Sequence, residues 1–78
     1  MLFTIENTKG KKVKVTDVMG KEITLVKEYD TETRKAKLGI RTKDEKGIVV
    51  IGDGVINAAL FIEVELTGSR ISVDGVEY

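Results

Sequence analysis

The chain has 78 residues, with 13 basic and 13 acidic side chains, and it contains no Cys, His or Pro. This composition excludes disulfides and thiolate catalysis, and the zero net charge removes any global field that would attract nucleic acid or an anionic membrane. A chain of this length is predicted to form one small domain over residues 1–78, near the lower limit for folding without a disulfide or a metal.

The N-terminal residues MLFTIENTKG lack a basic region followed by a long apolar stretch. No signal peptide is therefore predicted, and the cytoplasm is the expected compartment. The most apolar region, residues 48–66, is interrupted by Gly52-Asp53-Gly54 and by Glu63 and Glu65. Because a spanning helix needs about 20 mostly apolar residues, we expect no membrane insertion.

Three runs within the first thirty residues alternate apolar and polar side chains with a period of two, which is typical of half-buried strands. The apolar residues that share a face are Phe3 and Ile5, then Val13 and Val15, then Ile23, Leu25 and Tyr29. Gly20 suits the positive φ of a tight turn, so residues 13–29 are predicted to form a β-hairpin. Val18 and Met19 fall out of phase, which indicates a bulge or a wide turn, and Lys27 interrupts the last apolar row.

The next segment begins at the turn DTETR, where Asp30 can accept hydrogen bonds from backbone amides two residues further on. The run RKAKLGIRT then shows the clearest alternation in the chain, with Ala36, Leu38 and Ile40 on one face. After the polar turn KDEKG, the residues Ile48–Ile51 are all apolar. Such a run is covered on both faces or belongs to an interface.

Gly52-Asp53-Gly54 predicts a flexible corner, after which the segment VINAALFIEVEL has two parts. Val55–Ala59 fits either a helical turn or a strand. Residues 60–66 are predicted to form a strand with one solvent-exposed face. Apolar residues on one side, from Leu60 to Leu66, alternate with Phe61, Glu63 and Glu65 on the other.

The last segment predicts a hairpin between the strand RISV, whose Ile71 and Val73 face inward, and Val76–Tyr78. Asp74-Gly75 is the strongest hairpin signal because both central positions of a type I′ turn need positive φ. No segment keeps helical spacing of apolar residues over three turns. The predicted fold class is therefore all-β: six to seven short antiparallel strands in meander order, forming a small barrel or sandwich with at most one short helical turn.

Carboxylates are the main candidates for chemistry because the common proton shuttle and soft nucleophile are missing. Glu28, Asp30 and Glu32 form the most acidic neighbourhood, which offers oxygen ligands to a hard cation. A solvated turn capped by Asp30 accounts for the same residues, and their spacing does not match a calcium loop. We predict no catalytic residue, cofactor or metal ligand, and a carboxylate-based enzyme is the third functional hypothesis.

Basic side chains on two predicted strands support a second hypothesis, a nucleic-acid-binding barrel. These side chains would form one cationic strip if the two strands were neighbours. They are Lys12, Lys14, Lys35, Lys37 and Arg41. The four aromatic residues are not interleaved with these side chains, although base stacking requires exposed aromatic rings. Lysines on strand exteriors also discourage edge pairing, so nucleic-acid binding is kept as the alternative function.

The apolar residues between 48 and 62 support the preferred hypothesis, because the remaining strands offer mainly single faces to cover them. Exposed apolar patches on small proteins commonly mark interfaces, whereas a closed barrel would bury the segment within one chain. We expect a non-enzymatic interaction or assembly protein that self-associates or binds another protein, as accessory or structural subunits do, including viral ones. The candidate interface residues are Ile48, Val50, Val55, Ile56, Leu60, Phe61 and Ile62.

Overall fold

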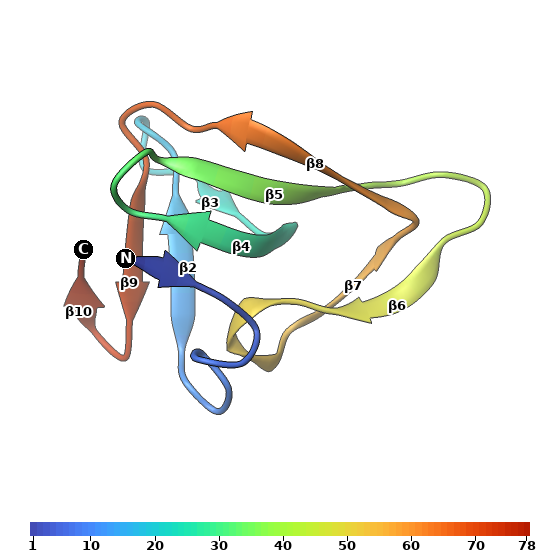
Figure 1. Cartoon of the computed structure of the whole chain (residues 1–78), viewed down its shortest axis with the longest axis horizontal. Coiled ribbons are helices and arrows are strands. Elements are labelled where there is room, and N and C mark those ends of the chain that lie inside the picture. Colours follow the sequence, from blue (N-terminus) through green and yellow to red (C-terminus); the bar gives the residue numbers. More distant parts are fainter.

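The computed structural model describes all residues 1–78, and it contains ten short antiparallel strands and one 3₁₀ turn, η1 (Figure 1). The elements in chain order are β1 (Leu2–Phe3), β2 (Val13–Thr16), β3 (Glu22–Ile23), β4 (Val26–Asp30), β5 (Lys35–Ile40), β6 (Lys46–Val49), η1 (Ile51–Asp53), β7 (Val55–Ala58), β8 (Leu60–Glu65), β9 (Arg70–Val73) and β10 (Val76–Glu77). The fold is all-β, as the period of two predicted.

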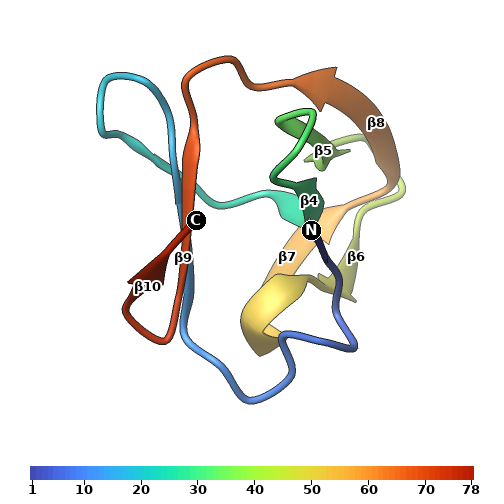
Figure 2. The same ribbon diagram turned by 60° about the vertical axis from the view of Figure 1, so that its left-hand side comes forward.

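The strands form two four-stranded sheets and a separate hairpin. Sheet A has the order β1-β4-β5-β8, sheet B has the order β10-β9-β2-β3, and β6 pairs only with β7. Figures 1 and 2 show sheets A and B as two layers, with the β6–β7 hairpin beside them. The sheets do not close into a barrel, so the architecture is a small sandwich with free edges.

The strand order is not the expected meander. β2 pairs with β9 and β1 pairs with β4, so each sheet contains partners that are far apart in sequence. The predicted hairpin over residues 13–29 is correct only as far as Ile23, because the chain then leaves sheet B and enters sheet A as β4. Alternation predicts that a segment is a strand, but it does not specify which partner the strand pairs with.

A bulge in β4 explains why the predicted apolar row of that segment is wrong. The register against β5 shifts between Val26 and Glu28, which leaves Lys27 as the extra residue. Such an insertion changes the phase of the side chains by one position. Val26 and Tyr29 are therefore both buried although they are three residues apart, while Leu25 is only half-buried.

The core lies between sheets A and B. Its buried residues are Phe3, Val15, Val26, Tyr29, Ala36, Ile51, Ile71 and Val73. The Tyr29 hydroxyl forms a buried hydrogen bond with Ser69 Oγ and accepts a second one from the Arg34 guanidinium at 3.2 Å. These bonds matter because a buried hydroxyl without a partner is costly.

Three turn predictions are confirmed. Asp74 and Gly75 have φ angles of 50° and 84°, as a type I′ turn requires. Gly20 has a φ of 82° in the turn between β2 and β3. The Asp30 carboxylate accepts the N–H of Glu32 at 2.9 Å, two residues further along the chain.

The one helical turn lies at Ile51–Asp53, whereas Val55–Ala59 forms β7 and then a bend at Ala59. The corner at Gly52-Asp53-Gly54, which was expected to be flexible, is held by hydrogen bonds to the N-terminal segment. Gly52 N–H donates to Thr8 Oγ1 at 3.0 Å, and the Asp53 carboxylate accepts the N–H of Gly10 at 2.6 Å. With three residues in its only helical segment, the chain has no helix suited to crossing a membrane.

Candidate interaction surface

β8 forms one edge of sheet A, since it pairs with β5 on one side and with no strand on the other (Figure 1). Its register with β5 is regular from the pair Ile40–Leu60 to the pair Lys35–Glu65. We call the unpaired side of residues 60–65 the β8 edge. An edge strand presents unpaired backbone N–H and C=O groups, which are a template for pairing with another chain.

The apolar face of β8 is covered at one end and open at the other. Leu60, Ile62 and Val64 share the face of the core residue Ala36, which lies opposite Val64. Val64 is half-buried, whereas Ile62 is 47% exposed and Leu60 is 59% exposed. Figure 1 shows the reason: β2 and β9 cross only the end of sheet A where β8 finishes, so nothing in sheet B covers its start.

The other face of β8 is polar except for Phe61. The Lys27 ammonium lies 4.8 Å from the centroid of the Phe61 ring, and this half-buried ring is therefore covered by a cation. The Glu63 carboxylate lies 3.8 Å from the Lys35 ammonium, and both of these side chains are about half exposed or more. Phe61 was predicted as an apolar interface residue, but the structure places it under Lys27.

The predicted interface residues of the β6–β7 hairpin lie in three different environments. Ile48 and Ile56 are directly opposite each other and half-buried. Val50 is only 4% exposed, so it contributes no surface. Val55 is 67% exposed and lies opposite Val49, which is also exposed although it was not predicted. Of the predicted set, the structure brings only Leu60 and Ile62 together as exposed neighbours on one strand face.

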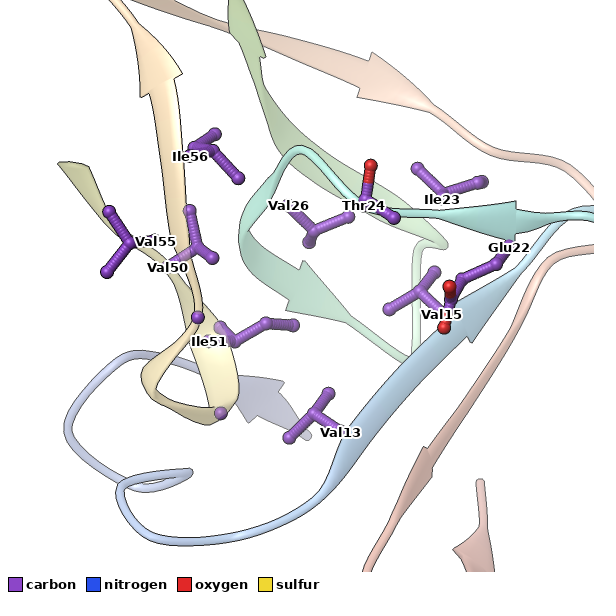
Figure 3. A pocket seen from close by; sticks show the side chains of 12 residues that line it. Val13, Val15, Glu22, Ile23, Thr24, Val26, Val50, Ile51, Val55 and Ile56 are labelled. Carbon is purple, nitrogen blue, oxygen red and sulfur yellow. The ribbon is translucent and has the colours of Figure 1, made fainter. Parts of the chain in front are cut away.

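Two residues of the predicted apolar run, Val50 and Ile51, line a cleft within the chain, at the η1 turn that connects β6 to β7. The η1 turn faces β2, β3 and β4 across this cleft, which has a volume of about 280 Å³ (Figure 3). Its apolar lining comprises Val13, Val15, Ile23, Val26, Val50, Ile51, Val55 and Ile56, with the exposed Glu22 and Thr24 beside them. The Ile51 side chain points from the turn into this space (Figure 3). Val50 and Ile51 are therefore covered by their own chain rather than by a partner.

The basic residues of the alternative hypothesis lie on two sheets. Lys14 belongs to β2 in sheet B, with Lys12 just before it, whereas Lys35 and Lys37 belong to β5 in sheet A. Three ion pairs join the others to carboxylates: Lys35–Glu63 at 3.8 Å, Lys37–Glu28 at 3.1 Å and Arg41–Glu45 at 3.7 Å. The neighbouring strands that a single cationic strip required are not formed.

The acidic neighbourhood of Glu28, Asp30 and Glu32 divides among different partners. Glu28 pairs with Lys37, Asp30 accepts a backbone amide, and Glu32 lies 3.8 Å from the amino terminus. No group of three or more Asp, Glu, His or Cys residues is placed to hold a metal. The three carboxylates are thus used in separate local contacts.

No protein family model matches this chain, and no curated protein or solved structure shows detectable similarity to it.

Proposed function

We propose that this chain is a non-enzymatic assembly protein that self-associates through the β8 edge. The observation that carries this proposal is the coincidence of two features on one strand. Leu60 and Ile62 are exposed on its apolar face, and its backbone is unpaired along the adjacent edge. A second strand placed there would satisfy the backbone groups and give both side chains apolar neighbours.

The composition of β8 supports this proposal. Monomeric sheet proteins commonly protect their edges with charged side chains, above all Lys, or with Pro, bulges or very short strands. The charges of β8 are Glu63 and Glu65, which lie on the face opposite Leu60 and Ile62. β8 has six residues, contains neither Lys nor Pro, and pairs with β5 without a register shift. By contrast, the edge strands β1, β3 and β10 have two residues each. Among the edges of the two four-stranded sheets, β8 is the only strand longer than two residues.

Catalysis and nucleic-acid binding have weaker support. The chain lacks His and Cys, and its acidic neighbourhood is dispersed among separate contacts. The basic residues lie on two sheets, and Lys35, Lys37 and Arg41 each have a carboxylate nearby. A cytoplasmic location remains part of the proposal, and fractionation of expressing cells tests it.

The test is the mass in solution, measured by multi-angle light scattering at micromolar concentration. The wild-type chain should give a multiple of 8.6 kDa, and Ile62→Lys should reduce it to the single-chain mass. Val55→Lys is the matched control, because it places the same charge on an exposed strand residue away from β8. A wild-type chain that stays monomeric, or an equal effect of both variants, would contradict the proposal.

A further inference from the structure

The backbone hydrogen bonds define which groups of β8 face its free edge. Gly39 N–H donates to Leu25 O at 2.8 Å on the β4 side of β5, and Leu66 N–H donates to Arg34 O at 2.7 Å on the β8 side. Hydrogen bonding in an antiparallel ladder alternates from residue to residue. Even-numbered residues of β5 therefore bond to β8. With the observed register, the backbone groups of β8 left free are those of Phe61, Glu63 and Glu65.

We propose that β8 pairs antiparallel with β8 of a second copy, with Ile62 opposite Ile62 across a two-fold axis. This inference rests on the proposed self-association. Symmetric pairing is the commonest solution for two identical chains. Because the free groups belong to odd-numbered residues, the central registers place Phe61, Ile62 or Glu63 opposite its own copy. The Ile62 register joins β8 of both copies by two hydrogen-bonded pairs, each between Phe61 of one copy and Glu63 of the other.

The two neighbouring registers are less favourable on observed grounds. Centring on Glu63 places two carboxylates directly opposite each other, and like charges in that position are destabilising. Centring on Phe61 pairs Glu63 with Ala59, whose N–H is already donated to Ile40 O at 3.1 Å. Centring on Ile62 avoids the opposed carboxylates. It sets Ala59 opposite Glu65, but it keeps two complete hydrogen-bonded pairs, whereas centring on Phe61 keeps only the pair between Phe61 and its own copy. The Ile62 register also places Leu60 of each copy opposite Val64 of the other, on the open apolar face.

Charge complementarity favours this register over the one centred on Phe61. Lys27 lies over the Phe61 ring, and Phe61 would be opposite Glu63 of the second copy on the same sheet face. The ammonium of each copy is thereby brought towards a carboxylate of the other. Glu63 is available for this contact because its intrachain ion pair with Lys35 is long, at 3.8 Å, and solvent-exposed. The two-fold axis generates this pair twice.

Single-cysteine variants test the register directly, because the chain has no Cys of its own. Directly opposite residues of a non-hydrogen-bonded pair have Cα atoms about 4.5 Å apart, which suits a disulfide. Ile62→Cys should therefore form a covalent dimer under mild oxidation at micromolar concentration. Phe61→Cys and Glu63→Cys are the matched controls and should not, since each is offset from its own copy beyond the roughly 7 Å that a disulfide can bridge.

The outcomes separate this inference from the proposed function. Efficient cross-linking of Phe61→Cys or Glu63→Cys in a protein that still scatters as an oligomer would overturn the register and leave self-association standing. Oligomers in which none of the three variants cross-links would overturn pairing through β8. A wild-type monomer would contradict both.

A charge exchange provides a second readout that does not depend on thiols. Lys27→Glu should weaken dimerisation about two- to fivefold for each of the two symmetry-related ion pairs that it removes, the range typical of an exposed pair, and adding Glu63→Lys should restore it. Sedimentation equilibrium measures both dissociation constants. An unchanged constant for Lys27→Glu, or a double variant weaker than either single variant, would show that the two side chains do not meet across the interface.

Discussion

The two ends of sheet A share one strand pairing and one alternation of side chains, but they differ in what lies across from them. At one end Tyr29 and Ala36 pack against sheet B and are almost completely buried. At the other end Leu60 and Ile62 occupy the same sheet face and remain exposed. The comparison shows that alternation determines which face a side chain occupies, whereas the extent of the opposite sheet determines whether that face is covered.

The largest expected difference between the two ends is in stability. Ile71 is completely buried, so Ile71→Ala should lower the free energy of unfolding by about 3 kcal/mol, within the range for buried aliphatic truncations. Ile62→Ala, the matched control at the open end, should cost less than about 1 kcal/mol, because an exposed side chain loses little burial. Urea denaturation at concentrations where the chain is monomeric measures both. Equal losses would mean that the open end is covered within one chain.

Gly39 in β5 and Gly47 in β6 test how closely the β6–β7 hairpin packs against sheet A. A Cβ on Gly39 would lie 2.9 Å from Ile56 Cδ1 and 3.0 Å from Ala58 Cβ, so β7 approaches this position closely. Gly39→Ala should therefore destabilise by about 1–2 kcal/mol through overpacking.

At Gly47 the nearest atom to an added Cβ is Val55 Cγ1, at an ordinary 3.4 Å. Gly47→Ala should therefore be neutral or stabilising by up to about 1 kcal/mol, because alanine restricts the unfolded chain. Thermal unfolding of both variants tests the contrast. A harmless Gly39→Ala would show that β7 does not pack against β5 at this position.

A further expected effect, similar in size to that of Gly39→Ala, concerns the polar contact within the covered end. Tyr29→Phe should cost about 1–2 kcal/mol because it leaves the buried Ser69 hydroxyl without its partner. Ser69→Ala in the Tyr29→Phe background should then add little, since the shared hydrogen bond is already lost. A double-mutant cycle by urea denaturation gives this coupling. Fully additive losses would show that the two hydroxyls do not interact.

Much of the fold could be predicted because its signals are local. The period of two in β5 and β8 correctly separates Ala36 and Val64 from the polar face, and Asp74-Gly75 forms the expected turn. The partner of each strand could not be predicted, because β2–β9 pairing joins segments that are far apart in the chain. The bulge at Lys27 was also missed, since one extra residue changes the phase without changing the composition.

The candidate site was predicted only in part. Leu60 and Ile62 were recognised as apolar, and the structure shows them exposed. Val50 was assigned to the same surface, although the η1 turn after it carries Val50 and Ile51 into the interior. The free edge of β8 has no signature in its residues, because being an edge depends on which strands are absent beside it. Tertiary arrangement therefore selects the surface from a longer apolar segment.

Under the proposed pairing, the backbone groups of Phe61 and Glu63 are free in a single chain and hydrogen-bonded in the assembly. Hydrogen exchange followed by NMR, at several protein concentrations, measures this directly. The amides of Leu60, Ile62 and Val64 should be protected at every concentration because they bond to β5, whereas protection of the Phe61 and Glu63 amides should rise as the chain associates. Association that leaves the exchange of Phe61 and Glu63 unchanged would contradict pairing through β8.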